Sequence, residues 1–155
     1  MIIINKRNLF FLISVWLLST LLSAQNVTIS TPQTQLLLSV PNGGTPEQLY
    51  YGSRTSDADI RSICETACRR NAYPVYGMGY PCETALSVRH ADGNLTLQMA
   101  VIGVKETRLT KENATLTVIE LKDKVYPFFV NICYKAWQDA DVIETWTEIR
   151  HEEKK

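Results

Sequence analysis

From residue 84 onward, the sequence alternates apolar and polar residues with a period of two, and turn dipeptides interrupt the runs. The first two runs, "TALSVRH" and "LTLQMAVIGVKETRL", flank "ADGN"; the next two, "ATLTVIELK" and "VYPFFVNICYKAW", flank "DK" at 123 and 124. A period of two places successive side chains on opposite faces of a β-strand. Asp-Gly between such runs is the strongest short-range hairpin signal. This half of the chain therefore predicts two antiparallel hairpins.

The last runs also predict which side chains share a face. In the run ending "KAW", one face consists of Phe128, Val130, Ile132 and Tyr134, and the other of Phe129, Asn131 and Cys133. In the final run, "DVIETWTEIRHEE", glutamates recur on one face, which is typical of a sheet side partly open to water. No turn or returning strand follows this run in the sequence. We therefore expect a sandwich that these residues do not complete, with an edge strand left uncovered.

The first half contains three more strand patterns and one helix. "VTISTPQTQLLLSV" (27–40) predicts two strands with a turn at Pro32, "PNGG" (41–44) predicts a tight turn, and "EQLYYGSR" (47–54) predicts a third strand. A short helix is predicted near residues 57–70. It can be capped by Ser56 or Asp57, and two arginines follow where the helix dipole favours cations. Its helically spaced apolar positions are Ile60, Ile63, Cys64 and Ala67.

Together, these patterns predict an all-β protein of seven or eight antiparallel strands, arranged as a β-sandwich, with the one short helix. The sequence has 155 residues and a formal net charge of zero. This length and composition fit one globular domain, and the balanced charge gives no indication of a nucleic-acid or membrane-surface partner.

Residues 1–24 predict a secretory signal peptide. Lys6 and Arg7 form a positive region, an apolar run from Leu9 to Leu22 follows, and "LLSAQ" predicts cleavage after Ala24. The alternative is an uncleaved anchor helix, but the run is short for a hydrocarbon layer about 30 Å thick. We expect an exported protein, periplasmic or extracellular, with residues 25–155 as its mature domain and no membrane contact after cleavage.

The cysteines and histidines do not predict a metal or cofactor site. Export permits disulfides, and Cys64, Cys68, Cys82 and Cys133 allow three pairings. On a helix, Cys64 and Cys68 would share a face. The sequence leaves open whether the cysteines are buried small hydrophobes or include one structural disulfide. A metal site would need further ligands, and His90 and His151 are far from the cysteines in sequence.

Motifs of known catalytic sites are absent from the sequence. Asp57 and Asp59 resemble a carboxylate pair, but their place at a helix start predicts capping instead. His90 stands beside the "ADGN" turn, and we expect it to hydrogen-bond to that turn. We therefore expect no catalytic residue in this chain.

The stretch "AYPVYGMGYPCE" (72–83) is the remaining candidate site. It carries Tyr73, Tyr76 and Tyr80 on a backbone rich in proline and glycine. Tyrosine rings can stack on the apolar faces of sugars while their hydroxyls reach polar groups. The alternative is that the three tyrosines only cover the end of the sandwich.

Five blocks of sequence, in order, resemble the N-terminal domain of glycoside hydrolase family 36 α-galactosidases. They are "QLYYGSR", "AYPVYGMGYPCETA", "LSVRHADGNLTLQM", "ATLTVIELKD" and "VNICYKAWQDADVIETWTEI". They match the family's "LYYG" strand, "YP…G…E-x-A" loop, "H-x-DG" hairpin and two later strand motifs. The resemblance covers about 100 of the 131 residues that follow the predicted signal peptide.

The resemblance implies a large N-terminal β-sandwich, of which residues 25–155 are a part, then a (β/α)₈ barrel and a small β domain. It implies retaining hydrolysis of terminal α-galactosides such as melibiose and raffinose by two aspartates on the barrel. A barrel needs about 250 residues, and the family's "K-W-D" nucleophile motif is absent here. The chain by itself is thus expected to be an inactive fragment. Its expected partners are the missing barrel, an α-galactoside oligosaccharide and other copies in a homo-oligomer.

In the family that the chain resembles, the loop matching Tyr73 to Glu83 leans toward the mouth of a sugar pocket, in its own or a neighbouring subunit. Some relatives carry "Asp-Phe-Arg" there, whereas this sequence has Tyr80, Pro81 and Cys82. Tyr76 and Tyr80 are therefore the predicted substrate-adjacent residues, acting by stacking. The alternative function is a free-standing carbohydrate-binding β-sandwich that uses the same loop.

Overall fold

A computed structural model describes residues 25–154 as two four-stranded antiparallel sheets with one α-helix. The predicted signal peptide, 1–24, lies outside the described residues. Within them, no helix is long and apolar enough to cross a membrane. The all-β sandwich and the number of strands are confirmed.

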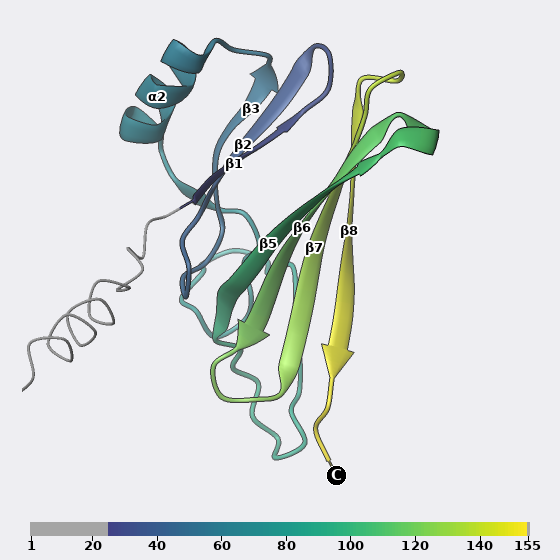
Figure 1. The fold of residues 1–155 in the computed structure, drawn as a ribbon. Coiled ribbons are helices and arrows are strands. Elements are labelled where there is room, and N and C mark those ends of the chain that lie inside the picture. Colours follow the sequence, from purple (N-terminus) through teal and green to yellow (C-terminus); the bar gives the residue numbers. More distant parts are fainter. Residues whose placement is uncertain (1–24, 155) are drawn as a thin grey trace, which may run out of the picture.

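Each sheet is built from segments that follow one another in the chain (Figure 1). The first sheet has the order β1-β2-β3-β4, and the second has the order β5-β6-β7-β8. Their bounds are β1 Gln25–Ser30, β2 Thr34–Val40, β3 Glu47–Ser53, β4 Arg70–Asn71, β5 Met99–Leu109, β6 Ala114–Asp123, β7 Phe128–Trp137 and β8 Val142–His151. Helix α2, Asp57–Thr66, connects β3 to β4, and a 3₁₀ turn, Thr110–Glu112, connects β5 to β6.

The core lies between the two sheets. The predicted apolar face of β7 is buried, with Val130 fully inaccessible. It faces the buried side of β1 and β2, where Ile29 pairs with Leu36. Because alternate residues of a strand point to opposite sides, a single period-two pattern supplies one wall of this core.

The two sheets are also joined at one end by a carboxylate. Asp141, in the left-handed conformation between β7 and β8 (φ 52°), accepts hydrogen bonds from Thr31 Oγ1 and from the backbone N–H groups of Gln33 and Thr34. These bonds, the one from Thr31 first, lower the pKa of Asp141. The β1–β2 turn is thereby tied to the β7–β8 turn, more than 100 residues later.

The helix begins as predicted but ends earlier. Ser56 is the N-cap, with its Oγ accepting from the Asp59 N–H (3.3 Å), and Asp57 and Asp59 lie in the first turn. The predicted end near residue 70 was wrong: α2 ends at Thr66, because Arg70–Asn71 pairs with β3 as strand β4. Cys68 therefore follows the helix and does not share a helical face with Cys64.

The predicted hairpin around "ADGN" is correct in its turn and wrong in its strands. The turn closes with His90 N–H donating to Asn94 O (2.8 Å), and Gly93 has φ +89°. The segments on either side are irregular, and β5 begins only at Met99. Their backbone groups instead bond to the preceding loop: Tyr76 N–H donates to Leu86 O, and Leu97 N–H donates to Tyr76 O.

The second hairpin forms with a longer connection than the predicted "DK". Strand β6 ends at Asp123 and β7 begins at Phe128. The Asp123 carboxylate organises this connection by accepting from the backbone N–H groups of Val125 (2.7 Å) and Tyr126 (2.8 Å). A side chain that satisfies two successive N–H groups replaces the ladder bonds that a two-residue turn would make.

Candidate functional site

The tyrosine loop, residues 73–83, lies in the irregular segment between β4 and β5. Figure 1 shows the loops that precede β5 at the same end of the molecule as the end of β8. The three tyrosines of the loop differ in exposure. Tyr73 packs against the core, whereas Tyr76 is 49% exposed and Tyr80 is 41% exposed. The structure thus separates one covering tyrosine from two that face solvent.

Met78 is a third exposed apolar residue of the loop, also at 41%. It alternates with Tyr76 and Tyr80 in the sequence "YGMGY", where Gly77 and Gly79 have φ of +98° and +74°. The two glycines supply backbone conformations that other residues rarely adopt. Sequence reasoning missed Met78, although the same "YGMGY" pattern contained it.

The loop is held firmly around Tyr76 although it has no regular structure there. Val75 is buried and forms an isolated parallel bridge with Leu86. Ala85 N–H donates to Pro74 O (2.7 Å), in addition to the two bonds at Tyr76. These bonds fix the backbone on both sides of Tyr76, so that its ring is presented from a defined position.

Replacing Gly77 with alanine tests this conformation. A Cβ at Gly77 would lie 2.5 Å from Thr96 Cγ2 and 2.9 Å from Thr96 Cα. We expect Gly77→Ala to lower the free energy of unfolding by about 2–3 kcal/mol. Gly79 also has positive φ, but a Cβ there would meet no atom within 4 Å, so Gly79→Ala should cost about 1 kcal/mol. Urea denaturation of both variants measures the difference, and equal losses would contradict the close approach.

A cluster of polar side chains surrounds His90, in the segment that follows the tyrosine loop in the chain. His90 hydrogen-bonds to the turn as predicted, and it does so through its backbone: its N–H donates to Asn94 O and its O accepts from the Gly93 N–H. The imidazole is buried and its Nδ1 lies 2.7 Å from Glu153 Oε1, while Glu153 Oε2 accepts from the Ala91 N–H. The bond from Ala91, followed by that from His90, lowers the pKa of Glu153. Sequence reasoning could not find this pair because its members lie 63 residues apart.

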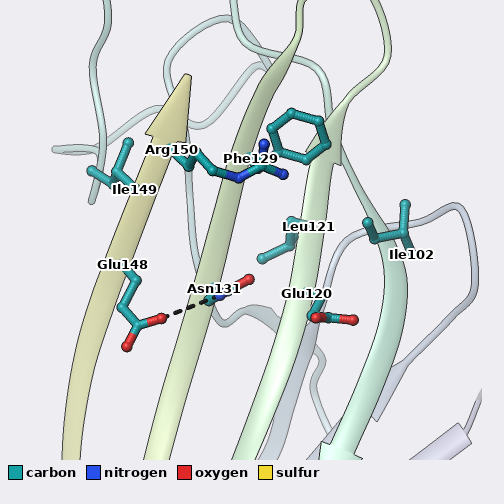
Figure 2. Close-up of a pocket in the computed structure, with 8 residues that line it drawn as sticks. All are labelled: Ile102, Glu120, Leu121, Phe129, Asn131, Glu148, Ile149 and Arg150. Carbon is teal, nitrogen blue, oxygen red and sulfur yellow. Dashed lines mark hydrogen bonds between the residues drawn. The ribbon is translucent and has the colours of Figure 1, made fainter. Parts of the chain in front are cut away.

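The outer face of the second sheet carries a shallow depression of about 350 Å³, shown in Figure 2. Its polar side chains contact their neighbours on the sheet. Asn131 Nδ2 donates to Glu148 Oε2 (3.2 Å), and the Arg150 guanidinium lies 3.9 Å from the centre of the Phe129 ring. These contacts are typical of a solvated sheet face, and nothing in them favours chemistry.

The cysteines differ in burial and are free. Cys133 is buried, Cys64 is half-buried, and Cys68 and Cys82 are exposed. Burial raises the pKa of the Cys133 thiol, which suits a small core residue. Among residues 25–154, the structure has no group of three or more side chains suited to hold a metal ion.

Comparison with known families identifies the domain. The family model of the glycosyl hydrolase family 36 N-terminal domain matches residues 44–155. The chain belongs to this family. The relationship expected from the five sequence blocks is therefore confirmed, and the tyrosine loop lies within the matched part of the family 36 domain.

Part of each of several solved α-galactosidases has the same fold as this family 36 domain. The enzyme from Lactobacillus brevis is 14% identical with a TM-score of 0.69, over 81% of this chain and 21% of that one. A variant of AgaA from Geobacillus stearothermophilus, solved with raffinose, is 15% identical with a TM-score of 0.71, over 83% and 22%. The galactosidase domain of the α-galactosidase–sucrose kinase AgaSK is 19% identical with a TM-score of 0.64, over 79% and 21%.

The chain thus spans about a fifth of the length of these solved chains. Among curated proteins, none matches it.

Proposed function

We propose that this domain is the non-catalytic N-terminal part of an exported α-galactosidase, and that its tyrosine loop borders the sugar pocket of a barrel in the same or a neighbouring subunit. The substrate class is terminal α-galactosides such as melibiose and raffinose. The family match and the raffinose-bound relative of the same fold support the substrate class. The charge pattern of residues 1–24 supports export, and an N-terminal residue of Gln25 in the secreted protein would test it.

The observation that carries the proposal is the presentation of Tyr76 and Tyr80. Both rings are about half exposed, and the backbone of Tyr76 is fixed by its bonds to Leu86 and Leu97 and by the neighbouring buried Val75. Exposed aromatic rings on a rigid support give contact area at low entropic cost. Pro81 and Cys82, which follow Tyr80, have no charged group that could hydrogen-bond to sugar hydroxyls. Stacking is therefore the mode of contact that we propose.

Substitution of the two tyrosines tests this contact in the α-galactosidase that carries the domain. We expect Tyr76→Ala and Tyr80→Ala each to raise KM for raffinose about two- to tenfold, because a lost aromatic contact costs about 0.5–1.5 kcal/mol. We expect kcat to change less, since the reacting carboxylates lie elsewhere. Tyr51→Ala is the control, because Tyr51 is 63% exposed but lies on β3.

Unchanged KM in both loop variants would refute the role of the loop. Titration of the separate chain with raffinose tests the alternative of a free-standing binding module. Raffinose binding by this chain, and its loss in Tyr76→Ala, would show that the loop binds sugar without a barrel.

A further inference from the structure

We propose that the buried His90–Glu153 pair is a positioning element for the tyrosine loop, acting through the turn at 91–94 and the segment that follows it. The inference rests on the proposed function in so far as that loop is the sugar-facing element. Three successive links connect the pair to the loop.

The first link is the pair itself. The side chain of His90 is 0% exposed and that of Glu153 is 12% exposed. A carboxylate only accepts hydrogen bonds, so the imidazole proton is on Nδ1 and points at Glu153 Oε1. The other carboxylate oxygen accepts from the Ala91 N–H at 2.9 Å. Nε2 is buried and has no partner among residues 25–154. Among residues 25–154, Glu153 therefore accepts the one side-chain hydrogen bond of the imidazole ring.

The second link holds the turn from its other side. The Tyr126 ring stacks on His90, with centroids 3.7 Å apart and an interplanar angle of 9°. The Tyr126 hydroxyl donates to Asp92 Oδ2 (2.7 Å) and accepts from Asn94 Nδ2 (2.9 Å). The turn is therefore bound by two segments: Tyr126 of the β6–β7 connection contacts Asp92 and Asn94, and Glu153, after β8, contacts Ala91.

The third link runs from the turn to the tyrosine loop. Asn94 Oδ1 accepts from the Thr96 N–H (3.0 Å), and the next residue, Leu97, donates its N–H to Tyr76 O (3.0 Å). Thr96 is also the residue that leaves no room for a Cβ at Gly77. Leu97 is fully buried and anchors the segment in the core. A shift of the turn is thus transmitted over three residues to the backbone that carries the Tyr76 ring.

Hydrogen exchange in the full chain tests the proposal. The reporters are the amides of Tyr76 and Leu97, and the reference amides are those of β6 and β7. Glu153→Met keeps a side chain of similar length but has no oxygen, so the His90 Nδ1–H and the Ala91 N–H both lose their acceptor. We expect exchange at both reporters to become about tenfold faster or more, with β6 and β7 unchanged. Glu152→Met is the matched control, because the Glu152 side chain pairs with exposed Arg150 and its loss should leave the reporters unchanged.

A second variant keeps the test decisive. His90→Phe retains a ring against Tyr126 but removes Nδ1, and it should accelerate the same reporters. The double variant should add little to either single change if the two residues act as one unit. Faster exchange confined to Ala91, or equal acceleration throughout β6 and β7, would overturn the proposal. The readout needs no sugar, so failure of the tyrosines to affect KM would leave this result intact, and the reverse also holds.

Discussion

Leu97→Ala is expected to lower the free energy of unfolding by about 2–5 kcal/mol, the cost of removing a large side chain from a packed core. Leu97 is 0% exposed and belongs to the core cluster between the sheets, although it lies outside any regular strand. Its backbone N–H also holds the tyrosine loop through Tyr76 O. The substitution should therefore destabilise the loop as well as the sandwich. Urea denaturation followed by tryptophan fluorescence measures the loss.

The matched control for Leu97 is two residues away in the same segment. Leu95 is 46% exposed, and Leu95→Ala should change stability by no more than about 0.5 kcal/mol. Similar losses for the two leucines would mean that Leu97 is not a core residue.

Asp123→Ala is expected to cost about 2–4 kcal/mol, for a different reason. Asp123 is only 1% exposed, and its carboxylate accepts from three backbone N–H groups. Gln98 donates to Oδ2 (2.6 Å), and Val125 and Tyr126 donate to Oδ1. Hydrogen bonds to a charged acceptor contribute about 1.5–3 kcal/mol each, and donors left without a partner in a buried site are costly. Alanine leaves all three donors without this acceptor.

The same denaturation assay measures the Asp123 variant. Asp139→Ala provides the control, because Asp139 is an exposed carboxylate in the β7–β8 connection, and its loss should stay within about 0.5 kcal/mol. A loss at Asp123 as small as that at Asp139 would show that water replaces the carboxylate without penalty.

Much of the fold was predictable because the signals that specify it are local. The period-two runs placed β6, β7 and β8, and "PNGG" and "ADGN" placed turns that form where expected. Ser56 and the first-turn aspartates located the start of α2. Each of these signals acts within a few residues, so a single sequence contains it in full.

The candidate site was predictable only in part. The proline- and glycine-rich backbone identified the tyrosine loop, but the sequence could not tell that Tyr73 turns to the core while Tyr76 and Tyr80 face solvent. Nor could it show that the segment before β5 gives its hydrogen bonds to this loop and so fails to form the predicted strands. A period-two pattern indicates that a segment can form a strand, but it does not indicate which other segment its backbone will bond to.

The sequence alone determined the all-β class, the "PNGG" and "ADGN" turns and the family, since these depend on local periodicity, turn chemistry and ordered blocks. The tertiary structure decided where α2 ends, which carboxylate holds His90 and which turn Asp141 fastens. These contacts join residues far apart in the chain, and their free energy exists only once packing has brought the partners together. Such contacts override local preference wherever the two compete.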